Sequence, residues 1–424
     1  MKFFLFLILS LLITGCSSVK KDEVQKGKKV ITLWETYNNE EHSVFLKLVD
    51  EFERHHPDIK IKVQRIPWDR HQMKLLVSMV THTAPDICRV DVALLPRLVK
   101  SGTVVDLTQY GGLEVAGDLM PAAVNSNIYS ESFFIEGSNS DKKHIFGLPD
   151  QTTGVALFYN KKSFREAGIQ SPPATWQEFV EAAKKLTVQT TSLQKRYGFA
   201  MWGFLWFNFP FFNTFGVKFI DETGKKCLLD SPEAERALQF MVDLNRKHKV
   251  EAGSWETASV NPEIGFMNGM YSMVFAGPWN IKRFKEAGID FGVSLIPRGP
   301  AGTSTNVGGS NMVVLRETKY PAECYEFLKF FSSHRIQAKW CNALGQIPVN
   351  VKAIPLIDFS KNPEIRIFTE QMKTAIARPP VMDYDGLEEA MNPQIQLAMS
   401  GTKLVRDALK DAVKKINKEV LTFE

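Results

Sequence analysis

The segment "KVITLWETYN" (residues 29–38) has the pattern of a buried strand that ends in polar residues, and it begins the series of elements that decides the fold. The next segment, "HSVFLKLVDEFERHHP" (42–57), carries apolar residues at helical spacing, and Pro57 ends the helix. A strand, a helix and a strand are then expected in turn over residues 59–66, 69–82 and 85–90. This β-α-β-α-β order predicts an α/β lobe with a largely parallel sheet.

The pattern starts again after residue 145. "IFGLPDQTTGVALFYNKKSFREAG" (145–168) contains a strand, a polar turn, a second strand and the start of a helix. Thr175 and Glu178 have capping-box spacing at the start of a helix over 175–187. Further helices are expected at 231–248, 320–333 and about 403–420, and further strands at 271–277, 290–297 and 311–315. The chain therefore predicts a second α/β lobe.

Composition narrows the class of protein. The chain has 424 residues, of which 44% are hydrophobic, enough for two large domains. The formal net charge of +5 is small and its charges are spread along the chain, so the sequence does not indicate a nucleic-acid-binding protein. The chain has no C-x-x-C motif, no His/Cys metal spacing, and none of the common motifs of hydrolases or nucleotide-binding enzymes. We expect no cofactor, no bound metal and no catalytic residue.

The N-terminus predicts export and a lipid anchor. An apolar run from Phe3 to Ile13 is too short to span a bilayer and ends in "LLITGC" (11–16). Ile13 to Cys16 resembles the bacterial lipobox, in which the cysteine is acylated and becomes the new N-terminus. We expect a signal peptide at 1–15, a lipidated Cys16 and a polar tether at 16–28. The alternative is an ordinary signal peptide with a chance cysteine.

The remaining cysteines are Cys88, Cys227, Cys324 and Cys341. Their wide spacing favours four buried, unpaired thiols. A disulfide stays open as an alternative, because an exported chain meets an oxidising environment.

Aromatic residues beside polar ones suggest a sugar site. They gather in "LWETYN", "MWGFLWFNFPFFN" (201–213) and "AGPWN" (276–280). Sugars present apolar C–H faces and hydroxyl groups, so their sites combine flat aromatic rings with Asp, Glu, Asn or Arg. About half of the 201–213 cluster is expected in the core, whereas Trp279 follows Gly-Pro in a turn and is the stronger candidate. Ligands of α/β sheets bind beyond the carboxyl ends of the strands, which directs attention to Glu35, Asn38 and Asp91.

Five segments in order resemble the family 1 extracellular solute-binding proteins, the maltose-binding and glycerol-phosphate-binding relatives that serve ABC importers. They are "TAPDICRVDVALLPRLVKSGTVVDLT", "IFGLPDQTTGVALFYNKKSFREAGIQSPPATWQEF", "FMNGMYSMVFAGPWN", "NALGQIPVN" and "AMSGTKLVRDALKDAVKKIN". The resemblance covers nearly all of residues 29–420. It implies a type II periplasmic-binding-protein fold, with two α/β lobes, each a mostly parallel sheet flanked by helices, and a ligand cleft at the hinge.

The resemblance also implies the site. It places Asp91 at a sugar-hydroxyl acceptor, Trp279 at a stacking tryptophan, Trp206 near a second aromatic, and Arg378 near a ligand-binding arginine. The full set of expected ligand-binding residues is Glu35, Asn38, Asp91, Asp150, Trp206, Trp279, Gly309, Ser310 and Arg378. One departure stands out: Glu388 lies roughly where maltose binders carry a further stacking tryptophan, which argues against a long maltodextrin.

From these features we expect lobe one at 29–148 and 298–358 and lobe two at 149–297 and 359–424. The expected function is capture of a carbohydrate and its delivery to the permease of an ABC transporter, by a monomer anchored outside the cytoplasm through Cys16. The partners would be the sugar, the permease subunits and the lipid bilayer, with no nucleic acid. The alternatives are a glycan-active enzyme, a ligand-sensing subunit, and a polyol-phosphate binder on the same fold.

Overall fold

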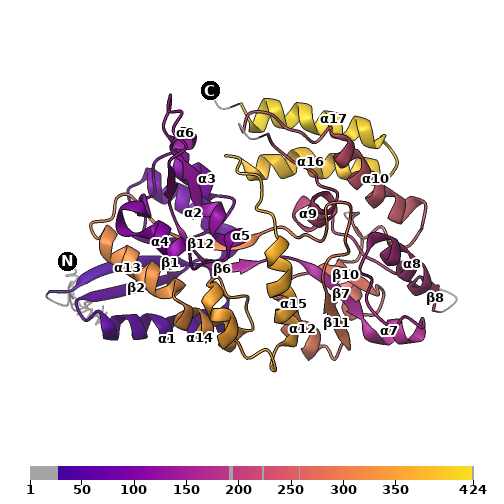
Figure 1. The fold of residues 1–424 in the computed structure, drawn as a ribbon, viewed down its shortest axis with the longest axis horizontal. Helices are drawn as coiled ribbons and strands as arrows, with labels where there is room; N and C mark the ends of the chain where they lie inside the picture. The colour runs from indigo at the N-terminus through magenta and orange to yellow at the C-terminus, as the bar shows by residue number, and fades with distance from the viewer. Residues whose placement is uncertain (1–26, 191–193, 222–223, 257, 423–424) are drawn as a thin grey trace, which may run out of the picture.

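The computed structural model describes residues 27–190, 194–221, 224–256 and 258–422, and Figure 1 shows two lobes side by side. The expected signal peptide, the Cys16 lipidation site and most of the tether lie outside these residues. Among the helices described, none is both long and apolar enough to cross a membrane. The same residues contain no cluster of three or more His, Cys, Asp or Glu suited to a metal ion.

The first lobe is built on a five-stranded sheet in the order β2-β1-β3-β12-β6. Its strands are β1 (Lys29–Glu35), β2 (Ile59–Arg65), β3 (Ile87–Asp91), β6 (Leu148–Thr153) and β12 (Gly308–Val314). β1 runs parallel to β2 and β3, as the sequence predicts. β12 runs antiparallel to β3 and β6, because it enters this sheet from the second lobe. β6 stays in this sheet to Thr153, past the expected boundary at residue 148.

Helices cover both faces of this sheet, and the alternation of side chains along the strands explains why. Leu33 and Met312 face α1 (Asn39–His55), α13 (Pro321–Ser332) and α14 (His334–Leu344) in one apolar cluster. Trp34 and Val313 face the side of α2 (Trp68–Val80) and α3 (Leu95–Lys100). Figure 1 shows these two helix layers on opposite sides of the strands. The shorter elements of this lobe are η1 (Leu107–Tyr110), α4 (Gly112–Ala116), α5 (Pro121–Val124), η2 (Asn125–Asn127), β4 (Ile128–Ser130), α6 (Glu131–Phe134), β5 (Lys143–Ile145) and η3 (Val351–Leu356).

The second lobe contains a three-stranded sheet in the order β10-β7-β11. Its strands are β7 (Ala156–Asn160), β10 (Met273–Ala276) and β11 (Phe291–Ser294). Both outer strands are antiparallel to β7, so the expectation of a mostly parallel sheet is wrong for this lobe. The cause is the direction of the chain: β7 leads away from the first lobe, whereas β10 and β11 lead back toward it.

The helices of the second lobe pack on both faces of β7. Leu157 faces an apolar cluster with α8 (Trp176–Leu186), α9 (Leu205–Thr214) and α10 (Pro232–Arg246), whereas Phe158 faces α12 (Asn280–Glu286) and α15 (Pro363–Gln371). Thr175 caps α8 as expected, but the Glu178 carboxylate accepts from the Ala174 N–H instead of completing the box on Thr175. The other elements are α7 (Lys161–Glu166), β8 (Val188–Gln189), β9 (Lys195–Arg196), α11 (Pro262–Met267), η4 (Met372–Thr374), α16 (Tyr384–Met399), α17 (Val405–Lys415) and η5 (Ile416–Val420).

The chain passes between the lobes in three segments that are hydrogen-bonded to one another through Thr305. The buried Thr305 hydroxyl accepts from the Val155 N–H at 3.0 Å and donates to the Val155 carbonyl at 2.9 Å. The Ile376 N–H donates to the Thr305 carbonyl at 2.9 Å, and the Val307 N–H donates to the Ile376 carbonyl at 3.0 Å. Segments far apart in the sequence are therefore fixed side by side at the hinge.

A buried ion pair ties β3 to β6 across β12. Arg89 Nε donates to Asp150 Oδ2 at 2.7 Å, and the Tyr37 hydroxyl donates to the same oxygen at 2.6 Å. Arg89 Nη2 also donates to Gln151 Oε1 at 2.5 Å. Burial raises the pKa of the Asp150 carboxyl, and the Arg89 guanidinium opposes that rise. The pair fixes the strand that leads into the hinge.

The cysteines follow the simpler expectation. Cys88, Cys227, Cys324 and Cys341 are all free and buried in the described structure. Burial raises the pKa of the Cys227 thiol to about 11, so this thiol is protonated at neutral pH. None of the four closes a disulfide that would hold the lobes together.

We expect Asp150→Ala to lower the free energy of unfolding by about 3–5 kcal/mol, because it leaves the buried Arg89 charge without its carboxylate. Urea denaturation measures this loss. The matched control is Glu51→Ala, which removes the partner of the half-exposed Lys339 and should cost about 1 kcal/mol or less. Equal losses in the two variants would contradict a special role for the buried pair.

Candidate ligand-binding cleft

A cavity with a volume of about 820 Å³ lies between the two lobes. Strand ends and loops of the first lobe form one wall, with Asp91 at the end of β3, Gln151 on β6 and Ser310 on β12. The second lobe forms the other wall, with Trp206 from α9 and Trp279 before α12. The volume is near the upper end of ordinary ligand pockets, about 300–1,000 Å³.

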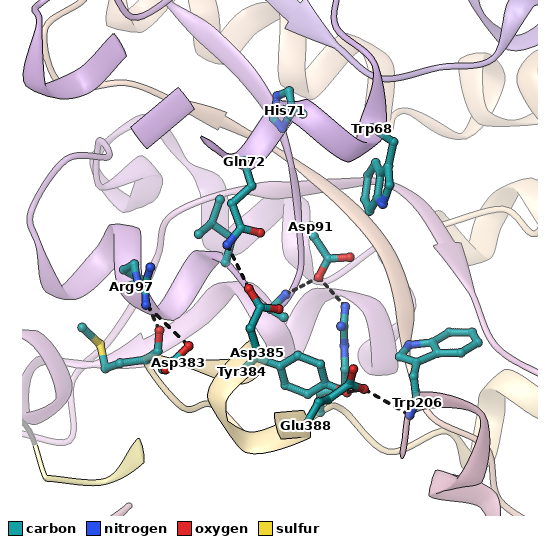
Figure 2. Close-up of a pocket in the computed structure, with 14 residues that line it drawn as sticks. Trp68, His71, Gln72, Asp91, Arg97, Trp206, Asp383, Tyr384, Asp385 and Glu388 are labelled. Carbon is teal, nitrogen blue, oxygen red and sulfur yellow. Dashed lines mark hydrogen bonds and ion pairs between the residues drawn. The ribbon is translucent and has the colours of Figure 1, made fainter. Parts of the chain in front are cut away.

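A smaller cavity of about 260 Å³, which we call the end pocket, adjoins this cleft. The two cavities share four lining residues, Trp68, Asp91, Trp206 and Arg378. Figure 2 shows the end pocket with Trp68 and Trp206 on one side and Arg97 and Asp383 on the other. The polar residues that line only the end pocket are His71, Gln72, Arg97, Asp383, Tyr384, Asp385 and Glu388.

Asp91 and Arg378 form an ion pair at the junction of the two cavities. Arg378 Nη2 donates to Asp91 Oδ1 at 2.5 Å, and the same oxygen accepts from the Ala93 N–H at 2.7 Å. The Arg378 side chain is only 7% exposed and lies over the Tyr384 ring at 4.7 Å. Burial lowers the pKa of Arg378, but Asp91 and Tyr384 together raise it by more, so the guanidinium stays charged.

The wall of the end pocket continues through α16. The Tyr384 hydroxyl donates to Glu388 Oε1 at 3.0 Å, and the Trp206 N–H donates to the same oxygen at 3.2 Å. Burial raises the pKa of the Glu388 carboxyl, whereas these donors and Arg378 lower it. Glu388 on α16 thus fixes the backbone of α9 at Trp206.

The basic groups that line the two cavities are already paired with carboxylates. Within the described residues the five pairs are Arg89–Asp150, Arg97–Asp383, Lys282–Glu40, Lys285–Glu364 and Arg378–Asp91. The remaining basic side chain is His71, and burial lowers its pKa to about 4, so it is neutral at pH 7. An anionic ligand would have to break one of these pairs to gain a cation.

Aromatic rings form much of the second-lobe wall. Trp206 and Trp279 lie 5.8 Å apart between ring centroids, and Trp279 is 44% exposed. Trp279 Nε1 donates to Glu263 Oε1 at 3.4 Å, which orients the indole. Gly277 is required beside it, because a Cβ there would lie 1.9 Å from the Trp279 ring. On the facing wall Trp68 is 53% exposed.

Seven of the nine expected ligand-binding residues line the cleft together. They are Asn38, Asp91, Trp206, Trp279, Gly309, Ser310 and Arg378. Gly309 has a φ of +113°, and a Cβ there would lie 2.2 Å from the Gln151 carbonyl oxygen. The fold therefore requires glycine at this position whether or not it contacts a ligand. Their part in ligand binding stays a prediction.

Glu35 and Asp150 do not line the cavity. Glu35 has no exposed surface, and its carboxylate accepts from the Tyr37 N–H and contacts His42 Nδ1 at 2.5 Å. Asp150 lies below the cleft floor in the pair with Arg89. Both residues support the strand ends from inside.

Sequence reasoning missed several lining residues. Trp68 follows the end of β2, so the strand-end rule that selected Asp91 could have found it. Tyr384 and Glu388 are four residues apart on one helix face, but nothing in the sequence distinguishes this pair from a surface pair. Arg89 lies inside β3 between the buried Cys88 and Val90, so its position in the sequence resembles a core position.

Comparison with known proteins now identifies the family. The sequence profile of the bacterial extracellular solute-binding proteins matches residues 38–338, so the chain belongs to that family. It is a family of solute-binding proteins and not of enzymes, which confirms the expectation that the chain is not an enzyme. Similarity to solved binding-protein structures confirms the expected two-lobe α/β binding-protein fold.

Individual relatives are distant but match over nearly the full length. A putative binding protein of Brucella abortus is 24% identical over 379 residues, 88% of each chain. The sn-glycerol-3-phosphate-binding periplasmic protein UgpB of Pectobacterium atrosepticum is 24% identical over 426 residues, 93% of this chain and 92% of that one. The GacH receptor of Streptomyces glaucescens, solved unliganded and with acarbose, is 25% identical with a TM-score of 0.76, over 94% of this chain and 100% of that one. The fold of the cyclic alpha-maltosyl-1,6-maltose binding protein of Arthrobacter globiformis is similar, with a TM-score of 0.80 at 23% identity over 92% of this chain and 99% of that one.

The ion pair at the cavity junction gives a testable energy. We expect a double-mutant cycle of Asp91→Asn and Arg378→Met to give a coupling energy of about 1–3 kcal/mol, because the arginine is buried and the carboxylate is partly exposed. Urea denaturation of the unliganded protein measures it. Asp91→Asn alone should destabilise the protein, since it leaves the Arg378 charge unpaired. A coupling energy near zero would show that the pair does not hold this wall.

Proposed function

We propose that this protein is the substrate-binding subunit of an ABC importer and that it captures a neutral carbohydrate between its lobes. The observation that supports a neutral ligand best is the pairing of every described cation along the two cavities. A phosphate or carboxylate group gains most from a free arginine, lysine or long helix N-terminus. A hydroxyl group instead bonds well to charged groups that are already paired, because carboxylates retain free lone pairs.

The shape of the cleft supports the same ligand class. Trp68 lies on one wall and Trp206 and Trp279 on the other, so flat rings are available to a sugar ring from both lobes. Between them, Asp91, Gln151 and Ser310 offer polar groups to hydroxyls. Aromatic faces with convergent polar side chains suit a molecule that is apolar on its faces and polar around its edge.

Two alternatives keep the fold and change the role. The relative that binds sn-glycerol 3-phosphate makes a polyol phosphate the main competitor as ligand. The paired cations disfavour it for this chain. A ligand-sensing subunit would use the same cleft, and transport assays distinguish it from an importer subunit.

The proposed location is outside the cytoplasm, with the acylated Cys16 in the lipid bilayer and the folded lobes on a short tether. The support is the Ile-Thr-Gly-Cys sequence after an apolar run, together with a family of extracellular proteins. In this arrangement the binding lobes stay near the permease, which raises their local concentration there.

We expect Trp279→Ala to weaken sugar binding by about 1–3 kcal/mol and to cost little folding stability, since its ring is 44% exposed before any ligand arrives. A thermal-shift screen of sugars first identifies a ligand, because saturation at 100 times Kd stabilises by about 2.7 kcal/mol. Calorimetric titration of that sugar and urea denaturation then measure the two effects. sn-Glycerol 3-phosphate serves as the anionic probe and should give no shift.

The matched control is Trp255→Ala, which removes a tryptophan of the second-lobe core that is 7% exposed. This variant should lose about 3–5 kcal/mol of stability. Its folded fraction should bind sugar normally. The opposite outcome, a destabilised Trp279→Ala protein with full sugar affinity, would contradict the proposed site.

We expect Cys16→Ala to abolish lipidation, because the thiol is the acceptor of the first acyl chain. Metabolic labelling with a clickable fatty acid measures this directly, and membrane fractionation shows whether the protein is released. Cys88→Ala is the control, since that thiol is buried in the fold. Equal label in the wild type and in Cys16→Ala would contradict the lipid anchor.

A further inference from the structure

A chain of aromatic rings leads out of the cleft along the second lobe. Trp206 and Trp279 line the cavity, and Phe207 contacts both, with centroid distances of 4.8 and 6.4 Å. Trp202 stacks on Phe207 at 4.2 Å and 14°, and Phe204 lies 6.4 Å from Trp202. We call Trp202, Phe204 and Phe207 the aromatic rim. None of these three lines either of the two cavities.

The rim is anchored by hydrogen bonds and is partly open to solvent, because Phe204 is exposed whereas Trp202 and Phe207 are half-buried. Trp202 Nε1 donates to the Phe275 carbonyl in the sheet at 3.1 Å, which fixes the indole. Asn208 Nδ2 donates to the carbonyls of Trp202 and Phe204 at 2.9 and 3.0 Å and holds the turn that carries them. Phe204 is 54% exposed, whereas Phe209 farther along α9 is 2% exposed and belongs to the core. The backbone that carries Trp202 and Phe204 is therefore held by hydrogen bonds, while the side chain of Phe204 stays exposed.

The chain segment that carries the rim is uncharged. Residues 197–217 contain no Asp, Glu, Lys or Arg. The amide of Gln396 on α16 comes near the backbone at Gly203, between the two outer rings, and has no hydrogen-bond partner among the described residues. An amide offers both a donor and an acceptor, as a sugar hydroxyl needs.

A second exposed apolar surface, on α2, differs from the rim in the type of its side chains. Met73, Val77 and Val80 on α2 are 67%, 54% and 81% exposed and share one helix face. These are flexible or branched aliphatic side chains with no ring, a composition suited to another apolar protein surface. The rim consists of flat rings alone, which suits the C–H face of a sugar.

We propose that the aromatic rim is a second carbohydrate-binding surface and that the ligand is a neutral oligosaccharide. One part of the ligand fills the cleft between the lobes, and further sugar units lie on Phe204 and Trp202, with Gln396 bonded to their hydroxyls. This inference rests on the proposed sugar-binding function and adds the ligand's size. The additional sugar units would lie at the rim. Glu388, which argues against a long maltodextrin, lies instead at the end pocket.

The experiment compares ligand lengths in the intact protein. Calorimetric titration uses malto-, cello-, xylo- and fructo-oligosaccharides, each from the monosaccharide to the heptasaccharide. In the series that binds, affinity should rise about tenfold or more between the disaccharide and the longer members. Phe204→Ala should remove about fivefold of that gain, and Phe204→Ala with Trp202→Ala most of it, while disaccharide affinity stays within twofold.

Matched variants separate stacking from other effects. Phe204→Tyr keeps a flat ring and should retain the length dependence, whereas Phe204→Leu keeps apolar bulk without a ring and should lose it. Val80→Ala removes an exposed aliphatic side chain on α2 and should change no sugar affinity. Gln396→Leu should weaken the long members only. Because Phe204 is more than half exposed, its variant should fold with an unchanged urea midpoint, so lost affinity reports binding.

Three results would overturn the inference. If no sugar of any length binds, the proposed function fails and the inference falls with it. If sugars bind but affinity is equal from disaccharide to heptasaccharide, the rim proposal alone fails. If length matters but Phe204→Ala leaves the gain intact, the extra units bind elsewhere. A rim that instead docks a protein would give this last pattern together with lost transport in cells.

Discussion

The two lobes depend on three chain segments that are held together at Thr305. This residue bonds to Val155 in the first crossing and to Ile376 in the third, and its own segment is the second. Buried backbone groups must find partners, so the three segments can move only as a unit or with a large loss of hydrogen bonds. The strands that leave this point, β6 and β12, carry Gln151, Gly309 and Ser310 into the cleft floor. The hinge and the binding surface are therefore one continuous piece of structure.

The ion pairs around the cleft determine what kind of ligand it can hold. Arg89 lies within the floor, and its charge is committed to Asp150 before any ligand arrives. Arg378 is committed to Asp91 in the same way. At the Arg89 pair, an anion would gain a cation at the expense of the buried Asp150 carboxylate, which would then be left unpaired at a high desolvation cost. A neutral molecule with hydroxyl groups leaves every pair intact and uses the remaining lone pairs.

Sequence patterns predicted the parts of this structure that periodicity controls. The helices at Pro232–Arg246 and Pro321–Ser332 follow from apolar spacing and a proline near the start, and both are present. The antiparallel β10 and β11 were not predictable, because pairing direction depends on where the chain returns across the hinge. Asp91 and Asp150 both stand near strand ends, yet Asp91 lines the cavity and Asp150 is buried. Asp150 is buried because it pairs with Arg89 on β3, on the far side of β12, and the sequence of one strand does not reveal a partner on another strand. Gln72 on α2 and Tyr384 on α16 come to line the same pocket only when the chain folds.

Contacts across the cleft mouth are weak compared with what a ligand can provide. Lys282 and Glu40 pair at 2.7 Å from opposite lobes, but their side chains are 65% and 55% exposed. Gln72 and Asp385 are 3.3 Å apart and also exposed. Pairs of this kind contribute about 0–1 kcal/mol each. A sugar that stacks on Trp68 from one lobe and Trp279 from the other adds several buried contacts at once. A ligand shifts a conformational equilibrium by its differential affinity for the two states, so under the proposed function the sugar would govern closure and the surface pairs would only help to align the lobes.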